Sequence, residues 1–294
     1  MKEKTIYALG FFDGVHLGHQ ALLKACAELA KLHDCNGGAV TFATHPESLT
    51  KGQMPNLINS LADRKRLLKA YGAEKIQVLP FDETLRKTHW SAFLEQLVAQ
   101  GAAGFVCGSD FRFGAAGSGT AQKLEDFCKE RKLPYAIVPQ QLLDGVRVSS
   151  TYIRQLLTQG RIKQANRFMG HSHIISGKVV AGKKLGTTLG IPTANVVLED
   201  GVICPKYGVY AANAVVDGKR YGAVTNIGTR PTVEGEGILA EAHLLDFAGD
   251  LYGKTITLEL LEFLRPEQKF ASLEQLKAEI EKNTQQTRKL LGKR

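Results

Sequence analysis

The feature that most constrains the fold is a short segment near the N-terminus, residues 10–19, which read GFFDGVHLGH. The segment directly follows an apolar run over residues 6–9. An apolar run that ends at glycine and continues into a helical pattern predicts a strand, a tight turn and a helix in succession. The N-terminus of such a helix offers free N–H groups and the positive end of its dipole to an anion. The segment therefore predicts an α/β unit with a nucleotide-phosphate site after its first strand.

Two histidines and several glycines of this segment are the candidate site residues. Spaced three residues apart, His16 and His19 are expected to share a helix face and to donate hydrogen bonds to phosphate oxygens as charge develops on them. Glycine lets the backbone approach a phosphate closely. The simpler alternative is a pair of surface histidines beside a turn. We assign a catalytic role to His16 and His19 and phosphate binding to Gly10, Phe12, Asp13, Gly14 and Gly18.

Composition and charge narrow the class of protein. The 294 residues suffice for one large domain or two ordinary ones, and no apolar stretch reaches the ~18 residues of a membrane span. The five cysteines are scattered without a Cys-x-x-Cys pair and no signal-peptide pattern is present, which favours a reducing, cytoplasmic location. The net charge of +9 is compatible with nucleic acid, with anionic nucleotides or with a solvated basic surface. Its spread along the chain argues against a nucleic-acid partner.

The first half of the chain alternates apolar runs with helical patterns. Such alternation is typical of a doubly wound parallel sheet, which binds ligands at the carboxyl ends of its strands. The expected strands lie near residues 4–10, 38–43, 75–79, 103–108 and 134–138, and the expected helices near 18–32, 60–71, 90–99 and 120–131.

The second half of the chain changes character. Residues 150–169 are expected to be helical, and the following β-rich runs predict a compact antiparallel barrel with a hairpin turn at Asp217-Gly218. A final helix is expected over 272–291. We therefore predict two domains, residues 1–165 and 166–294. The β-rich runs lie near 173–181, 207–216, 220–227, 239–247 and 254–263.

A second candidate site falls in the barrel half. Gly182, Lys183 and Gly186 begin a basic glycine-rich loop suited to phosphates. If Thr193 and Asn195 lie in a strand, they share a face, and their oxygens could hold one Mg²⁺ among phosphate oxygens; a polar edge strand is the alternative. A carboxylate near a metal-bound triphosphate is a candidate general base, which assigns Glu241, unless its strand simply turns a polar face to water.

Taken together and in order, these segments resemble the bacterial bifunctional riboflavin kinase/FMN adenylyltransferases, also called FAD synthetases. The His-x-Gly-His element within 10–19 is similar to the signature of the nucleotidylyltransferase superfamily. The resemblance implies that the barrel phosphorylates riboflavin with ATP to FMN, and that the N-terminal domain joins FMN to AMP from a second ATP, giving FAD and pyrophosphate. It is carried by residues 10–19, 41–46, 108–114 and 147–154, and by 182–195, 207–210, 226–232, 241–247 and 264–270.

The resemblance also implies roles for individual residues. A neutral riboflavin hydroxyl needs a base, which would be Glu241, with Thr193 and Asn195 holding Mg²⁺ and phosphate. The FMN phosphate is already an anion and needs only charge screening. The donors for that screening would be His16, His19, Ser150, Thr151 and Arg154.

Further residues are expected near the flavin or the nucleotide. Asp110, Phe111 and Phe113 would border the flavin or adenine pocket, with aromatic packing under a loop as the alternative for the two rings. His45 would shape the same pocket. Arg265 would hold nucleotide or flavin in the kinase half, unless it forms a surface ion pair.

Two other functions stay open at this stage, and so does the oligomeric state. Thr187 stands where the family has an arginine, and Asn283 where an acidic residue is common, so that only the adenylyltransferase half could be active. A flavin-binding regulator that contacts RNA would require a Lys/Arg stripe interleaved with exposed aromatics, which the sequence does not show.

Overall fold

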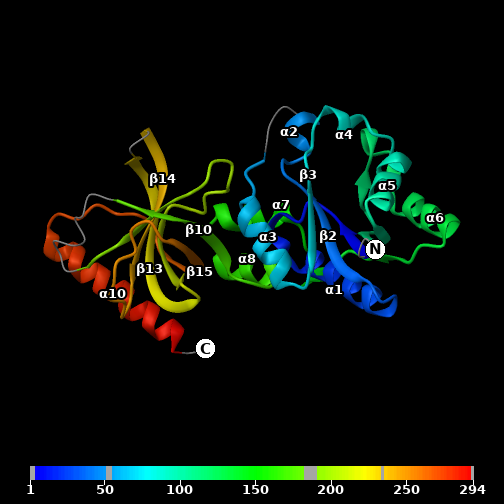
Figure 1. The fold of residues 1–294 in the computed structure, drawn as a ribbon. Helices are drawn as coiled ribbons and strands as arrows, with labels where there is room; N and C mark the ends of the chain where they lie inside the picture. The colour runs from blue at the N-terminus through cyan, green and yellow to red at the C-terminus, as the bar shows by residue number, and fades with distance from the viewer. Residues whose placement is uncertain (1–3, 51–54, 182–190, 233–234, 293–294) are drawn as a thin grey trace. The chain divides into compact units, whose positions relative to one another are not determined.

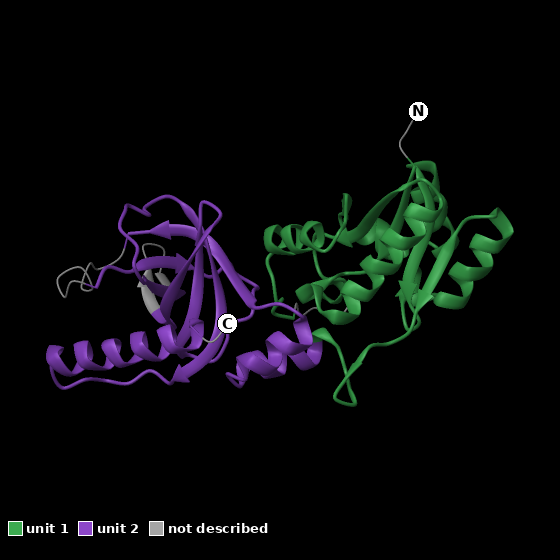
Figure 2. Cartoon of the chain, turned by 90° about the horizontal axis from the view of Figure 1, so that it is seen from below, with its two compact units in different colours: residues 1–150 green, residues 151–294 purple. Residues whose placement is uncertain are grey.

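The computed structural model describes residues 4–50, 55–181, 191–232 and 235–292, and the chain divides into two compact units (Figures 1 and 2). Unit 1 comprises residues 1–150 and unit 2 comprises residues 151–294. The division falls at the start of helix α7 (Ser150–Thr158), so that α7 and helix α8 (Ile162–Met169) group with the second unit. The functional domain boundary at 165 stays a prediction.

Unit 1 is built on a five-stranded parallel sheet in the order β3-β2-β1-β4-β7. The five predicted strands are confirmed to within two residues at each end. β1 pairs with both β2 and β4, so the strand order reverses there, and ligands bind at such a reversal in open α/β sheets. The strands are β1 (Thr5–Leu9), β2 (Asn36–Phe42), β3 (Lys75–Leu79), β4 (Ala102–Gly108) and β7 (Tyr135–Val138).

The helices of unit 1 bury apolar faces against this sheet. The four predicted helices are confirmed as α1 (Leu17–Leu32), α3 (Leu61–Ala70), α5 (Trp90–Ala99) and α6 (Ala121–Arg131). Several elements too short to show a hydrophobic period were not predicted. They are η1 (Asp13–Val15), α2 (Glu47–Thr50), α4 (Glu83–Lys87), β5 (Arg112–Phe113), η2 (Ala115–Gly117), β6 (Gly119–Thr120), β8 (Leu142–Leu143) and β9 (Val146–Arg147).

Unit 2 contains a closed antiparallel barrel in the order β10-β11-β14-β13-β12-β15. The predicted barrel is confirmed, and the hairpin turn is also present, with Asp217 and Gly218 at φ 49° and 79° between the paired residues Val216 and Lys219. β11 is a sixth strand that the β-rich runs did not include. The strands are β10 (His173–Val180), β11 (Ala194–Val197), β12 (Gly208–Val216), β13 (Lys219–Thr232), β14 (Gly235–Leu244) and β15 (Thr255–Arg265).

The predicted terminal helix is present as α10 (Leu273–Leu291), and it packs on the barrel. A Cβ at Gly222 of β13 would lie 2.6 Å from a methyl group of Leu291, so this glycine permits the close approach of helix and strand. Arg288 of α10 also forms a two-point ion pair with Asp246, both bonds at 2.7 Å.

The expected single helical stretch over 150–169 is two helices separated at Gly160, which has a φ of 76°. The side chain of Asn166 in α8 joins two barrel strands. It donates to the carbonyl of Leu260 at 2.8 Å and accepts from the N–H of His173 at 2.8 Å. These bonds satisfy backbone groups that burial would otherwise leave unpaired.

All five cysteines are free. Among the described residues, no helix is long and apolar enough to cross a membrane. The cytoplasmic location stays a prediction.

His173 is fully buried at the start of the barrel, and neither ring nitrogen has a hydrogen-bond partner among the described residues. Burial, aided by the nearby His171, lowers the pKa of His173 from 6.5 to about 3. Below pH 6.5, His173 therefore binds a proton in the unfolded chain but not in the folded chain. The free energy of unfolding falls as the pH falls toward 3.

We expect His173→Leu to remove this acid sensitivity. The free energy of unfolding of the variant, relative to that of the wild type, should rise by about 2 kcal/mol when the pH is lowered from 7.5 to 5. Each pH unit below the pKa of the unfolded state corresponds to about 1.4 kcal/mol. Denaturant unfolding of the full chain at both pH values measures this. His173→Gln, which stays polar but cannot titrate, is the control and should lose the acid sensitivity equally. An unchanged pH dependence in both variants would contradict the prediction.

Candidate active sites

The loop between β1 and α1 has an unusual backbone. Phe12, Gly14 and Val15 have φ angles of 60°, 79° and 36°. Positive φ is rare for bulky residues and costs of the order of 1–3 kcal/mol for each. Phe12 and Val15 are nevertheless fully buried, so packing holds them in place. The loop is therefore strained, and it depends on its surroundings for its shape.

Side chains from elsewhere in unit 1 bind the carbonyls of this loop. The carbonyl of Phe11 accepts from Thr41 Oγ1 at 2.8 Å and from an Arg64 guanidinium nitrogen at 3.1 Å. Gln20 Nε2 donates to the Val15 carbonyl at 2.8 Å. These contacts tie the loop to β2, α3 and α1.

Asp13 braces the same loop from within. Its carboxylate is buried and accepts the N–H groups of Ile58 at 2.8 Å and Asn59 at 3.4 Å. Its backbone carbonyl accepts from Ser150 Oγ at 2.9 Å, which fastens the loop to the first residue of α7. Through these bonds Asp13 shapes the loop, and its predicted binding of phosphate stays a prediction.

His16 and His19 lie together, although not as predicted. His16 precedes α1 as its N-cap, and its Nδ1 accepts from the N–H of His19 at 3.3 Å. The expectation that both lie on one helix face is therefore wrong for His16, because its backbone is extended. The two rings stack instead, with centroids 3.7 Å apart and planes at 12°.

Burial lowers the pKa of His19 well below 6.5, and the neighbouring His16 and Arg64 lower it further. His19 is therefore neutral near pH 7. Its Nδ1 is buried without a hydrogen-bond partner among the described residues. A neutral imidazole can donate through one nitrogen only, so His19 offers a phosphate a single hydrogen bond.

The glycines of this segment make room for protein atoms. A Cβ at Gly14 would lie 2.8 Å from the Ile58 side chain, and one at Gly18 would lie 3.2 Å from the His16 ring. At Gly10 the nearest atoms belong to the Phe12 ring, at 3.2 Å. Close approach of phosphate to these glycines stays a prediction.

Three of the residues expected near the flavin contact other aromatic rings. The ring of His45 packs edge-on against Phe11 at 4.6 Å, and its Nδ1 accepts from the N–H of Glu47. Phe113 is buried in the hydrophobic core beside Phe93, which favours the packing alternative for this residue. Phe111 stacks on Phe113 at 5.4 Å and stays partly exposed, so a ligand could reach it.

Asp110 forms an ion pair with Arg147, and each side chain is about half exposed. Thr151 and Arg154 follow Ser150 on α7 and belong to unit 2, where Thr151 is exposed.

Strand pairing brings three polar residues of the barrel into one row. Asn195 of β11 is directly opposite Glu241 of β14, which in turn is opposite Asn226 of β13. Side chains paired in this way lie on one face with their Cβ atoms about 4.5–5.5 Å apart. Asn195 is buried, whereas Glu241 and Asn226 are partly exposed. Asn226 had no assigned role, and it also donates to Glu267 at 3.1 Å.

The structure contradicts one of the remaining assumptions about the barrel. Thr193 lies just before β11 rather than within it, so the assumption of one strand is wrong for this residue. The nearby carbonyl of Pro192 contacts Nδ1 of His243 at 3.0 Å. Among the described residues, no cluster of three or more His, Cys, Asp or Glu side chains could hold a metal. Gly182, Lys183 and Gly186 lie outside the described residues.

Arg265 interacts with α10. Its side chain donates to Asn283 at 3.1 Å and lies 3.3 Å from a carboxylate oxygen of Glu279. Only 16% of the side chain is exposed. The structure therefore favours the ion-pair alternative, as a partly buried contact with the terminal helix.

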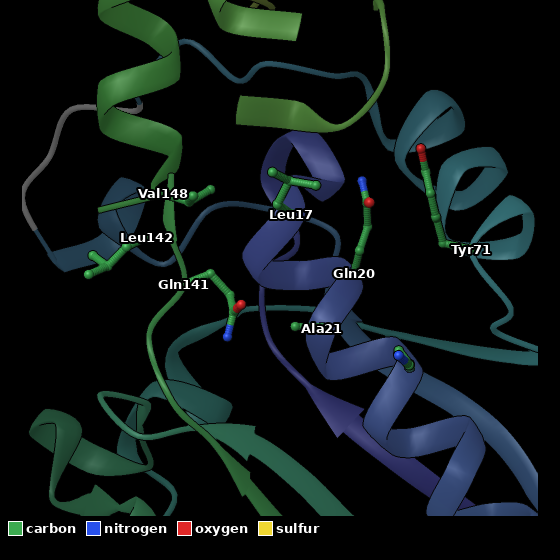
Figure 3. A pocket seen from close by; sticks show the side chains of 8 residues that line it. Leu17, Gln20, Ala21, Tyr71, Gln141, Leu142 and Val148 are labelled. Carbon is green, nitrogen blue, oxygen red and sulfur yellow. The ribbon is translucent and has the colours of Figure 1, made fainter. Parts of the chain in front are cut away.

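A pocket of about 440 Å³ lies over α1 in unit 1 (Figure 3). None of the predicted site residues lines it. The lining residues are Leu17, Gln20, Ala21, Lys24, Tyr71, Gln141, Leu142 and Val148.

Sequence reasoning missed one functional candidate, Arg64. It lies on α3 with Leu67 and Leu68, at the three- and four-residue spacing of a buried helix face. A charged residue at an apolar position was the available signal.

Comparison with known proteins places both halves of the chain. The family model described as FAD synthetase matches residues 1–152, and the model described as riboflavin kinase matches residues 169–291. The chain belongs to the bacterial bifunctional riboflavin kinase/FMN adenylyltransferase family. The member from Listeria monocytogenes is 33% identical, with 98% of this chain and 93% of the relative covered. The member from Bacillus subtilis is 35% identical, with 97% and 92% covered.

The fold of this family member is also found among solved structures. A crystal structure named as a macrolide-efflux protein from Streptococcus pneumoniae superposes with a TM-score of 0.87 at 30% identity. The match covers 98% of this chain and 95% of the other.

We expect Gly14→Ala to destabilise unit 1 and to disturb the loop that carries the histidines. Positive φ costs an alanine about 1 kcal/mol, and the contact with Ile58 adds a steric penalty, so the total loss should reach about 2–3 kcal/mol. Gly145→Ala is the matched control, because its φ of 75° is similar and no atom lies within 4 Å of the added Cβ. Thermal and denaturant unfolding compare the two variants. Equal losses would show that the packing at Ile58 contributes nothing.

Proposed function

We propose that this protein phosphorylates riboflavin with ATP to FMN and adenylylates FMN with a second ATP to FAD, with release of pyrophosphate. The observation that carries the proposal is a difference between the two candidate sites. The barrel offers a carboxylate between two amide side chains, whereas unit 1 offers stacked histidines at a helix N-terminus. Family membership of both halves supports the same assignment.

The proposed adenylyl transfer needs no general base. The FMN phosphate is already an anion and attacks the α-phosphorus of ATP, forming one P–O bond while the bond to pyrophosphate breaks. The donors we assign to the developing charge are His16 and His19, with N–H groups at the start of α1. Ser150, Thr151 and Arg154 are proposed as further donors. The flavin is proposed to contact His45, Phe111 and Asp110.

The proposed kinase step does need a base, because the riboflavin hydroxyl must lose a proton. We assign Glu241 to accept it as the hydroxyl oxygen bonds to the γ-phosphorus and ADP leaves. Oxygen atoms of Thr193 and Asn195 suit Mg²⁺, which prefers oxygen ligands and is usually coordinated by substrate phosphates as well. Bound Mg²⁺ would neutralise charge on the triphosphate.

We expect Glu241→Gln and His16→Asn to separate the two activities. Glu241→Gln should lower FMN formation from riboflavin by about 10²–10⁴-fold and leave FAD formation from FMN unchanged, because a lost base affects only the kinase step. His16→Asn should lower FAD formation from FMN and leave FMN formation from riboflavin unchanged. The measurement incubates each protein with ATP, Mg²⁺ and either riboflavin or FMN, and resolves the flavins by chromatography.

Matched controls use the same substitutions at other positions. Glu262→Gln on β15 and His33→Asn at the end of α1 should leave both activities unchanged. FAD from FMN but no conversion of riboflavin in the wild type would mean that only the adenylyltransferase half is active. No conversion of either flavin would refute the enzyme assignment and leave the RNA-binding regulator, which a salt-dependent RNA titration then tests.

We expect Asn195→Ala to raise the Mg²⁺ concentration needed for half-maximal kinase activity by about tenfold, the size typical of a weakened metal shell. Adenylylation assayed in the same preparation should keep its Mg²⁺ dependence. Titration of Mg²⁺ into chelator-treated protein measures both. An unchanged kinase titration would remove Asn195 from the metal site and leave the base assignment of Glu241 standing.

A further inference from the structure

Arg64 is a fully buried arginine that the proposed reaction has not yet used. Its side chain is 0% exposed. Burial lowers the pKa of Arg64 to about 10, against an opposing effect of the nearby Asp13. A guanidinium stays charged even so, and burying a charge is unfavourable unless specific contacts compensate for it. The contacts that compensate for its burial therefore indicate the structural role of Arg64.

Those contacts join two strand ends. One terminal guanidinium nitrogen donates to the carbonyl of Phe11 at 3.1 Å, and the other donates to the carbonyl of Phe42 at 2.7 Å. Phe11 is the second residue after β1, and Phe42 is the last residue of β2. The two strands are paired in the sheet. The guanidinium therefore spans the carboxyl ends of adjacent strands, at the edge where the proposed adenylyl transfer takes place.

The same guanidinium supports the strained loop and affects His19. Its carbon lies 4.1 Å from the centre of the Phe11 ring, so that it contacts both the backbone and the side chain of that residue. Its positive charge is one of the causes that lower the pKa of His19. His16 and Arg64 are charged or titratable neighbours of the His19 ring, and Asp13 in turn acts on Arg64.

We infer that Arg64 is a positioning residue for adenylyl transfer, which joins the ends of β1 and β2 and so fixes the loop that carries His16 and His19. The inference rests on the proposed assignment of that loop to adenylyl transfer. Because its side chain is fully buried, Arg64 acts through the loop and not on the substrate. Lysine cannot replace it fully, since a single ammonium group lacks the planar fork that binds two carbonyls and stacks on a ring.

The test compares Arg64→Met and Arg64→Lys in the full-length protein. Arg64→Met should lower kcat for FAD formation from FMN by about 100-fold, with the KM values for ATP and FMN changed less than about threefold, as expected when donors that act in the transition state are displaced. Arg64→Lys should lower kcat about tenfold, because lysine keeps the charge and loses the fork. Riboflavin kinase activity, which resides in the other unit, should stay unchanged in both variants.

Two controls make the result specific. Lys65→Met changes the exposed neighbour of Arg64 on α3 and should leave both activities at the wild-type level. His16→Asn, assayed in parallel, tests the site itself. All assays are run well below the unfolding temperature of each variant, which is measured first.

The outcomes distinguish the inference from the proposed function. If Arg64→Lys keeps the wild-type kcat for FAD formation, whether or not its KM values rise, the positioning role is refuted. This variant decides the matter even if Arg64→Met does not fold. If His16→Asn retains full FAD formation, the assignment of the loop to adenylyl transfer fails, and the role of Arg64 fails with it. Loss in His16→Asn together with wild-type kcat in both Arg64 variants refutes the Arg64 inference only.

Discussion

The candidate site of unit 1 depends on the strained backbone of residues 12–15. Positive φ at Phe12 and Val15 is unfavourable in isolation and persists only where the surrounding structure compensates for it. Here the compensation comes from segments far apart in the sequence, including the end of β2, helix α3 and the first residue of α7. The candidate site is therefore a product of tertiary contacts. Its local sequence predicts where it lies but does not determine its shape.

The sheet and the long helices of unit 1 were predictable for a simple reason. A parallel strand that is buried on both faces is a near-continuous apolar run, and a helix of ten or more residues shows its hydrophobic period. The candidate site was located from residues 10–19 alone, and the structure adds that this segment follows the strand at which the sheet order reverses. The roles of His16 and Arg64 were not predictable. Helix capping by His16 depends on one extended backbone conformation, and the charge of Arg64 is typical of exposed residues.

Register explains what the sequence could not reveal about the barrel. Asn195 and Glu241 were candidates because of their chemistry, yet only the pairing of β11 with β14 brings them opposite one another. β11 has four residues, too few for a clear alternation of apolar and polar side chains. Asn226 joins them through a second pairing across β13. A shift of one residue in either pairing would turn these side chains to opposite faces, so the polar row depends on the register of the whole barrel.

The two proposed reactions place different electrostatic demands on their sites, and the charges of unit 1 suit the one assigned to it. An anionic phosphate that attacks another phosphate is repelled by a fixed negative charge, so a carboxylate in that site is useful only if it is neutralised. Asp13 is the buried carboxylate there, and it is held by backbone N–H groups beside the positive Arg64. The opposite charges offset one another within the protein. In the proposed site, the histidines and the helix N-terminus are the donors that would meet the charge of the triphosphate.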